Sequence, residues 1–350
     1  MYLYIGIYAA LAFAAFFLRS RRASWQAAVA VGGFLVLFMG GRREVGCDYL
    51  TYESRFATLY PPGYGWLDAL GDTEGGFQWV NVLARDLGWG FNGVIMLCAA
   101  VYGAALVRFS RLAPRPLALI AIAFPILVLQ LGMSGMRQAM ATAFLMLAYA
   151  AFSERRQWVT AAWVGVAYLF HESAIALLPI AFLARRQISP KYLVLGVLLL
   201  APVAGWLLGD RFEVYSARYI EQVYGENASG GAWFRYAAAV LPFLLFFWKR
   251  RRVQAAFPGL YPLFWLFMVL TFALVLVGAV SSVALHRLTF YVLPVSLLAF
   301  LCVVESIFAP GSRRLARALP FAIYGLYILS WFLLSRHGTS CYIPYQSWLL

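Results

Sequence analysis

Charged residues are scarce in this sequence and are nearly missing from the middle of its long apolar runs. Only 12% of the residues are charged and 63% are hydrophobic, with a mean hydropathy of +0.77. Soluble domains carry roughly 25% charged residues, so an ordinary soluble fold is excluded. The runs are about as long as a bilayer core is thick, and they do not alternate as barrel strands would. These features predict an all-α polytopic integral membrane protein without a large soluble domain.

The sequence also lacks closely spaced cysteines and metal-binding motifs. None of the four cysteines pairs at CxxC spacing, and neither HExxH nor DxD occurs. We therefore expect no metal and no cofactor. Cys47 and Cys341 would share one face of the membrane, which leaves a disulfide open, but we expect four unpaired thiols. The first apolar run has no basic residue before it and no cleavage site, which predicts a retained span instead of a signal peptide.

The apolar runs predict about 12 membrane segments, within a range of about 10 to 13, in a single transmembrane domain covering residues 1–350. The segment 158–184 is short for two spans, so it predicts either two tilted helices or a re-entrant pair meeting at "FHES". The predicted segments lie at residues 2–18, 25–41, 89–107, 116–133, 137–152, 158–171, 174–184, 192–208, 233–248, 258–280, 287–308 and 319–335.

The distribution of lysine and arginine predicts the orientation. Alternate loops, after the odd-numbered segments, hold 18 of the 28 basic residues, and the positive-inside rule assigns them to the cytoplasm. Of the 14 acidic residues, 12 lie toward the other face. Both termini are then periplasmic. The net charge of +14 is spread over short turns without a basic, aromatic-rich patch, which argues against a nucleic acid partner and suits contact with membrane lipids.

Two long outer loops are the most elaborate parts of the predicted topology. Residues 42–88 contain a turn-rich stretch followed by a segment with apolar residues near helical spacing, and residues 209–232 show a tyrosine-rich pattern of the same kind. Each loop predicts a short helix lying in the membrane interface.

Ionisable residues at the ends of spans are the candidates for function, because charge near a membrane is costly. Arginine forks grip phosphate oxygens, and a nearby acid or histidine can accept a proton from a hydroxyl, so converging arginines predict a site for a lipid pyrophosphate. The candidates form four outer clusters: Arg42, Arg43, Glu44 and Asp48; Arg137; His171 and Glu172; His286 and Arg287.

Each candidate also has a structural explanation. Arg42 and Arg43 can snorkel or pair with nearby acids, and His171 can serve as an interhelical hydrogen-bonding group. The tyrosines and Trp66 of loop 42–88 suit an aromatic belt as well as a sugar platform. Arg137 is harder to explain structurally, because the small residues of "SGMRQAMA" let helices approach closely around it.

The motifs "RREVGCDYLTYESRF", "GMRQAMATAFLMLAYAAFSERRQ … YLFHESAIALLPI" and "HRLTFYVLP" occur in this order. In this the chain resembles the EpsG-type, Wzy-like family of bacterial exopolysaccharide and O-antigen polymerases, over most of its length. The resemblance implies a GT-C-like, metal-independent membrane glycosyltransferase of the cytoplasmic (inner) membrane. Its expected reaction, at the periplasmic face, transfers glycan from undecaprenyl-pyrophosphate to an acceptor sugar hydroxyl. Undecaprenyl-pyrophosphate-linked oligosaccharides are then donor and acceptor, and other polysaccharide synthesis or export proteins are expected partners.

The resemblance, with the shared outer position, suggests a role for each matching residue. The expected roles are pyrophosphate binding by Arg43, Arg137 and Arg287 with Arg42 in support, proton acceptance by Asp48, then His171, then Glu44, and sugar contact by Tyr49, Tyr52 and His286.

Three other functions stay open at this point. A transporter or flippase of lipid-linked sugars would also use buried arginines, but it needs polar residues near the bilayer midplane, and these spans collect theirs at one end. An outward-facing O-antigen ligase or O-acyltransferase would share the outer site, and a scaffold in an export complex would tolerate changes at Asp48 or Arg137.

Overall fold

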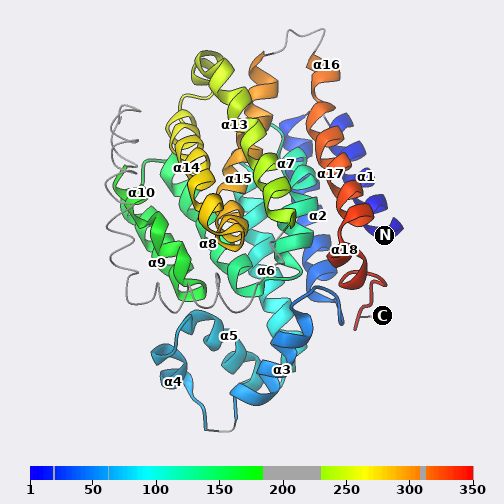
Figure 1. The fold of residues 1–350 in the computed structure, drawn as a ribbon, viewed down its shortest axis with the longest axis vertical. Coiled ribbons are helices and arrows are strands. Elements are labelled where there is room, and N and C mark those ends of the chain that lie inside the picture. Colours follow the sequence, from blue (N-terminus) through cyan, green and yellow to red (C-terminus); the bar gives the residue numbers. More distant parts are fainter. Residues whose placement is uncertain (19, 62, 184–229, 308–312, 350) are drawn as a thin grey trace.

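The computed structural model describes residues 1–18, 20–61, 63–183, 230–307 and 313–349, and the regular secondary structure in these ranges is helical (Figure 1). Helices satisfy every backbone hydrogen bond within one segment, which is the condition for crossing a bilayer. The predicted segment 192–208 and most of the outer loop 209–232 lie outside the described residues.

The first half of the chain gives a series of helices that includes one 3-10 and one π segment. They are α1 (Tyr2–Phe17), α2 (Arg21–Gly40), α3 (Tyr49–Leu59), α4 (Trp66–Gly71), α5 (Gly75–Asp86), α6 (Gly90–Ser110), α7 (Pro116–Ala123), the π-helix η1 (Phe124–Gly132), α8 (Met136–Ser153), α9 (Gln157–Phe170), the 3-10 helix η2 (Glu172–Leu177) and α10 (Leu178–Leu183).

The second half supplies longer helices. They are α13 (Gly230–Ala256), α14 (Tyr261–Val280), α15 (Ser282–Ile307), α16 (Arg313–Ala316), α17 (Leu319–Leu334) and α18 (Arg336–Ser340). Five helices in the described ranges are long and apolar enough to cross a membrane, namely α2, α6, α13, α14 and α15, and shorter apolar helices accompany them. The chain is therefore a membrane protein by composition and fold, while a total of 12 spans stays a prediction.

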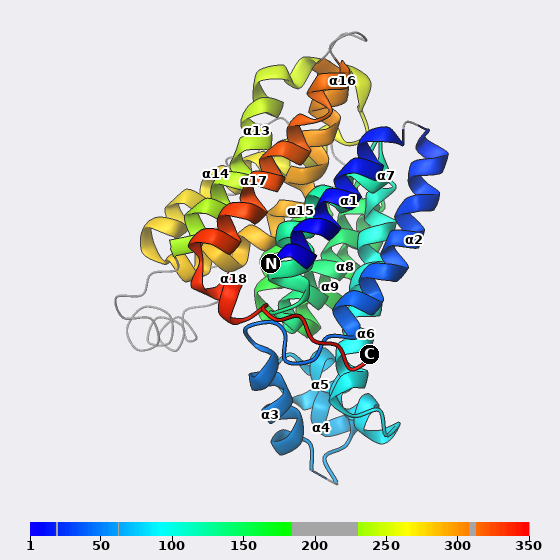
Figure 2. The same ribbon diagram turned by 90° about the vertical axis from the view of Figure 1, so that its right-hand side faces the viewer.

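The centre of the bundle is formed by α7, η1 and α15 (Figures 1 and 2). Every residue of α7 is buried, and 83% of the apolar window of α15 is buried, against 39% for α2, α13 and α14. The outer helices therefore present apolar side chains to their surroundings, as lipid-facing helices do. The predicted break at "FHES" is present, because α9 ends at Phe170 and η2 begins at Glu172.

Helices α3, α4 and α5 form a separate small unit at one end of the bundle, which we call the α3–α5 unit (Figures 1 and 2). This unit is the predicted loop 42–88 in folded form. Its apolar side chains include Leu67, which is 82% exposed, and the exposed tryptophans Trp66 and Trp79. An exposed apolar face on short helices beside a membrane bundle suits the predicted position in the interface.

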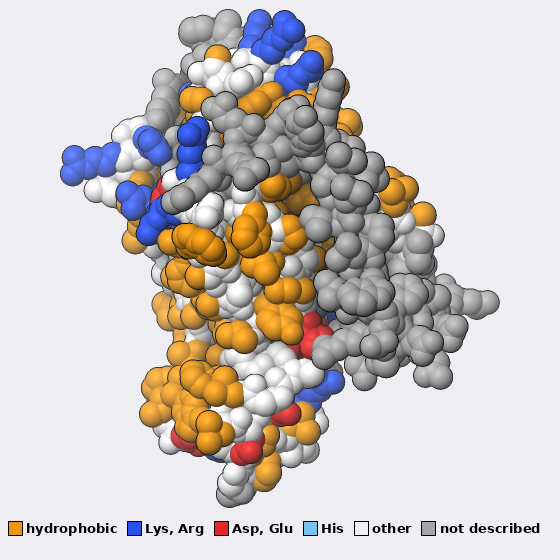
Figure 3. Space-filling view, turned by 90° about the vertical axis from the view of Figure 1, so that its left-hand side faces the viewer, with side chains coloured by type: hydrophobic (Ala, Val, Ile, Leu, Met, Phe, Trp, Pro, Cys, Tyr) orange, Lys and Arg blue, Asp and Glu red, His pale blue; other side chains and the backbone are white. Residues whose placement is uncertain are grey.

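Charge is divided between the two ends of the molecule. In Figure 3 the Lys and Arg side chains gather mostly at the end opposite the α3–α5 unit, and Asp and Glu lie mainly at its end. Basic residues hold cytoplasmic loops in place, so this division matches the orientation that the sequence predicts.

A disulfide joins Cys47 to Cys341, with Cα atoms 4.8 Å apart, across 294 residues of sequence. The expectation of four unpaired thiols is therefore wrong for this pair, whereas Cys98 and Cys302 are free and buried. Spacing in the sequence could not reveal the pair, because the two cysteines meet only when the C-terminal tail folds back across the bundle.

The C-terminal tail holds the exit of α2 with backbone hydrogen bonds. The amide of Arg43 donates to the carbonyl of Gln346 at 3.0 Å, and the amide of Trp348 donates to Gly41 at 2.9 Å. The amide of Gly46 donates to the carbonyl of Cys341 at 2.8 Å. The segment from Gly41 to Cys47 is thereby fixed before α3 begins.

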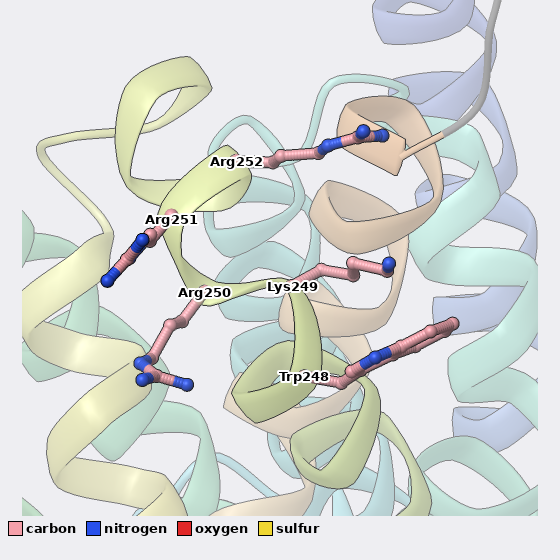
Figure 4. A pocket seen from close by; sticks show the side chains of 5 residues that line it. All are labelled: Trp248, Lys249, Arg250, Arg251 and Arg252. Carbon is pink, nitrogen blue, oxygen red and sulfur yellow. The ribbon is translucent and has the colours of Figure 1, made fainter.

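The opposite end carries a basic hollow of about 330 Å3. Helix α13 kinks at Lys249, whose φ of −112° and ψ of 18° are not helical, and the kink turns consecutive side chains in different directions (Figure 4). The hollow is lined by Trp248, Lys249, Arg250, Arg251 and Arg252. It lies at the predicted cytoplasmic end, opposite the α3–α5 unit (Figure 1).

Candidate functional site

An ion pair between Arg137 and Glu74 forms the centre of a polar cluster. Arg137 is the second residue of α8, and Glu74 is the residue before α5. The Oε1 atom of Glu74 lies 3.8 Å from Nδ1 of His171, directly after α9. The side chains of Glu74 and His171 are 11% and 15% exposed, while that of Arg137 is 34% exposed. The cluster therefore consists of a partly exposed guanidinium next to a largely buried carboxylate and a largely buried imidazole.

Two glycines allow Glu74 to reach this position. A Cβ atom on Gly75 would lie 2.6 Å from a backbone oxygen of α4, and one on Gly76 would lie 3.0 Å from both the Cβ atom and the carbonyl oxygen of Leu169. The start of α5 therefore packs directly on the end of α9. Because His171 follows that end, the close approach brings Glu74 to the imidazole.

A third glycine places the α3–α5 unit beside the start of α8. Gly46 has a φ of +107°, and a Cβ atom there would overlap the carbonyl oxygen of Met133 in the turn before α8. The chain then enters α3, where the ring centroid of Tyr52 lies 5.9 Å from the guanidinium carbon of Arg137. Arg137 is thus held between Tyr52 on one side and Glu74 on the other.

The imidazole of His171 is part of a hydrogen-bonded chain. Its Nδ1 lies 2.9 Å from Oγ of Ser173, and that hydroxyl lies 2.8 Å from the hydroxyl of Tyr291 in α15. Burial lowers the pKa of His171 to about 3, and the charges of Arg287 and Arg137 add to this effect. The ring is therefore neutral at physiological pH and has a hydroxyl partner at Nδ1.

The acid of the cluster also has a shifted pKa. Burial raises the pKa of Glu74, the positive charge of Arg137 opposes that shift, and the nearby Glu172 reinforces it. A second arginine joins from α15, since the carbonyl of Arg287 accepts a hydrogen bond from Nε2 of Gln138 at 2.6 Å. The charge of Arg287 is also near enough to lower the pKa of His171, so Arg137, His171 and Arg287 lie in one region at this end of the bundle.

Arg42 lies elsewhere, in the protein interior. Its residue exposure is 1%, Nε donates to the carbonyl of Val45 at 3.0 Å, and Nη1 donates to the carbonyl of Met39. Its backbone also bridges to Ser347 in the C-terminal tail. This side chain fixes the turn after α2 from inside, and we leave it out of the candidate site.

The charged residues of the first motif that follow Arg42 are exposed. Arg43 pairs with Glu44 at 3.8 Å, with side chains 63% and 52% exposed. Asp48 is exposed at the start of α3 and makes no capping hydrogen bond there. The rings of Tyr49 and Tyr52 are buried, packed at centroid distances of 5.3 Å on Phe91 and 5.5 Å on Phe77 respectively, so their faces are already occupied.

Sequence reasoning missed Glu74, Ser173 and Tyr291. Glu74 stands in "DTEGGFQW", where the glycine pair after an acid is a sequence signal for close backbone approach. Ser173 follows "HE" in the "FHES" motif. Tyr291 has no signal of its own, because it lies in an apolar run and becomes a partner only through the packing of α15.

The chemistry of the cluster is that of a site for an anion and a hydroxyl group. In the described part of the chain no three or more His, Cys, Asp or Glu side chains gather as metal ligands would. Arg137 can donate to phosphate oxygens with its exposed edge, and His171 can exchange a proton with a hydroxyl group held beside it.

Comparison with known proteins identifies the family. No curated protein and no solved structure matches the chain. The EpsG family model matches residues 27–347, which run from within α2 to beyond α18 and include every residue of the cluster. The chain belongs to the EpsG family and is a polysaccharide-polymerase-like membrane protein.

Proposed function

We propose that this protein polymerises lipid-linked oligosaccharide repeat units into an exopolysaccharide at the outer face of the bacterial cytoplasmic membrane. The donor is a glycan on undecaprenyl pyrophosphate, and the acceptor is a sugar hydroxyl of a second lipid-linked unit. The observation that carries the proposal is the half-exposed guanidinium of Arg137, fixed by Glu74 beside His171 and Arg287. Family membership supports the same reaction class.

The proposed step transfers one glycosyl group. The acceptor oxygen attacks the anomeric carbon of the donor sugar, and the bond between that carbon and the pyrophosphate oxygen breaks. The bonding electrons leave with undecaprenyl pyrophosphate, whose added negative charge the guanidinium of Arg137 stabilises, with Arg287 beside it. The hydroxyl proton passes to a base.

We place the base at His171, with Asp48 and Glu44 as alternatives. In the tautomer that carries its proton on Nδ1, the ring donates to Ser173, so that the lone pair of Nε2 can accept the hydroxyl proton. The carboxylate of Glu74 then stabilises the imidazolium. The pKa of His171 is about 3 partly because Arg137 and Arg287 are cationic, and a bound pyrophosphate would offset both charges and raise it.

Two independent features support the outward orientation of the site. Basic residues lie mostly at the opposite end, which the positive-inside rule assigns to the cytoplasm. The disulfide Cys47–Cys341 lies at the end of the α3–α5 unit, and disulfides persist in oxidising compartments such as the periplasm.

Reconstitution in proteoliposomes with lipid-linked repeat units tests the function. The wild-type protein should give a ladder of products that differ by one repeat, and Arg137→Gln should slow the ladder by about 100-fold or more, as loss of a charge-stabilising donor does. Arg55→Gln is the matched control, because Arg55 is an exposed arginine of α3 outside the cluster. A single added unit would indicate a ligase, acetate release an acyltransferase, and unchanged substrate inside the vesicles a flippase.

A further inference from the structure

A second polar cluster lies on another side of α15 from the first. Its centre is Arg235 of α13, whose Nε and Nη2 donate to Oε1 of Gln130 at 3.0 and 2.7 Å. Arg235 also contacts His286 through Nη1, and its guanidinium carbon lies 4.5 Å from the ring centroid of Phe290. The hydroxyl of Tyr327 in α17 donates to the same Oε1 at 3.1 Å.

Among the residues that the structure describes, Arg235 is a buried charge without an acidic partner. Its residue exposure is 6%, and within the described ranges no carboxylate lies at ion-pair distance from it. A buried cation without an anion carries a large desolvation penalty. This distinguishes Arg235 from Arg137, which has Glu74.

The amide of Gln130 adds an unused donor to this charge. Gln130 is 8% exposed, and its Nε2 is buried with no hydrogen-bond partner among the described residues. A flip of the Gln130 side-chain amide would not satisfy this donor, because the NH2 group would then face the guanidinium of Arg235. Gln130 also belongs to the π-helix η1, a geometry that occurs frequently at functional sites. A positive charge and an unsatisfied donor in one place have the chemistry of a site for an anion.

The two clusters are linked by neighbouring residues of α15. His286 and Arg287 are consecutive in α15, and they contact different partners: His286 contacts Arg235, and the backbone of Arg287 accepts from Gln138 of α8. Both lie four to five residues from the start of α15, which is about 6–8 Å along the helix axis. Both clusters therefore lie near the same end of α15.

We propose that Arg235, Gln130 and His286 form a second anion site, which takes the pyrophosphate of the acceptor lipid while the Arg137 cluster takes that of the donor. The assignment to a lipid rests on the proposed function, because a polymerase must hold two lipid-linked substrates at once. The anion supplies the negative charge that Arg235 lacks and accepts from Nε2 of Gln130.

Gln130→Glu tests the anion site directly. The new carboxylate has the shape of the amide and gives Arg235 an internal counter-ion, so the full-length protein in detergent should melt at the same or a higher temperature. In an Arg137→Gln background, which isolates the second site, Gln130→Glu should weaken inorganic pyrophosphate binding at least tenfold. Gln346→Glu adds the same charge on the exposed C-terminal tail and should leave binding unchanged.

A lipid ligand and a free anion are separated with farnesyl pyrophosphate as a second probe. The Arg137→Gln protein should bind it more tightly than inorganic pyrophosphate and should lose that binding with Gln130→Glu; equal affinity for the two probes contradicts the lipid assignment. Pyrophosphate binding that is unchanged by Gln130→Glu would falsify the anion site. If Gln130→Glu does not fold, Arg235→Gln is measured in its place, and a lower melting temperature with unchanged binding assigns a structural role instead.

These results are distinguishable from failure of the proposed function. If Gln130→Glu in the Arg137→Gln background abolishes pyrophosphate binding but the wild-type protein makes no polymer, the anion site stands and polymerisation is wrong. If the wild-type protein polymerises, Gln130→Glu alone polymerises equally well, and the same change in the Arg137→Gln background leaves binding intact, the second site alone is wrong.

Discussion

At the scale of single residues, the contact between Glu74 and Arg137 defines the candidate site. The acid is 11% exposed and the arginine 34%, so one partner is buried and the other still reaches the surface. A buried carboxylate needs a partner, and the arginine needs a fixed orientation to present its open edge to an anion. In the proposed function the pair serves folding and substrate orientation together, and its two members should respond differently to substitution.

Glu74→Gln should slow polymerisation by about tenfold while leaving the protein folded, because the amide keeps the shape of the acid but no longer fixes the Arg137 charge. The rate of repeat addition in proteoliposomes and the melting temperature in detergent measure the two effects. Glu53→Gln removes an exposed acid of α3 and serves as the control. A Glu74→Gln protein with the parental rate would show that Arg137 needs no counter-ion for its role.

His171 predicts a pH dependence of stability. Its pKa is about 3 in the folded protein and 6.5 in its ordinary state, so the unfolded chain binds the extra proton between these values. Stability should therefore fall as the pH drops from about 6.5 toward 3, and His171→Asn should flatten part of that decline. Melting curves across this range check the difference between the two proteins. An equal slope for the wild-type and His171→Asn proteins would contradict this prediction.

At the scale of elements, the docking of the α3–α5 unit depends on close backbone approach. Gly46 touches the turn before α8, and Gly76 lets α5 pack on the end of α9. Both contacts bring a short helix, weak on its own, against the long helices of the bundle. Since Glu74 lies at the start of α5, the packing of this unit sets the geometry of the candidate site.

Gly46→Ala should destabilise the protein by more than the strain of its backbone alone, which costs about 1–3 kcal/mol. The added Cβ atom meets the carbonyl oxygen of Met133, so the α3–α5 unit must move away from α8. Gly63→Ala is the matched control, because Gly63 has a similar φ of +103° but nothing within 4 Å of the added atom. Equal melting temperatures for the two variants would contradict the packing argument.

At the scale of the whole molecule, the C-terminal tail is joined to the segment that follows α2. The disulfide Cys47–Cys341 and the backbone contacts of the C-terminal tail tie the exit of α2 to the end of the chain. Such a long closed loop restricts the unfolded state strongly. These contacts lie at the end of the bundle that carries the candidate site, so they hold the start of the α3–α5 unit against the bundle.

Breaking the disulfide should lower stability by about 2–4 kcal/mol, so that reduction or the Cys47→Ser, Cys341→Ser pair lowers the melting temperature. The same bond tests the orientation. In intact spheroplasts an impermeant maleimide should label Cys47 and Cys341 only after treatment with an impermeant reductant, whereas the buried Cys98 and Cys302 stay unlabelled. Labelling that requires a permeant reductant places this end in the cytoplasm.

Much of the architecture could be predicted because it depends on local pattern. Apolar runs placed most helices within a few residues, and the break at "FHES" separates α9 from η2 as expected. The first motif was harder to interpret: Arg42 looks like its neighbour Arg43 in the sequence, yet one is buried and the other is exposed. Local pattern could not separate them, because the difference comes from the C-terminal tail, about 300 residues away.

By itself the sequence determined that this is a helical membrane protein with basic residues at one end, since hydropathy and charge act residue by residue against the bilayer. Its motifs also determined the family. Only the tertiary structure decided which side chains meet: Glu74 with Arg137, Arg235 with Gln130, and Cys47 with Cys341. The physical reason is that a buried charge or thiol takes its partner from whatever the packed helices bring within a few ångströms, and that proximity is set by packing across the bundle.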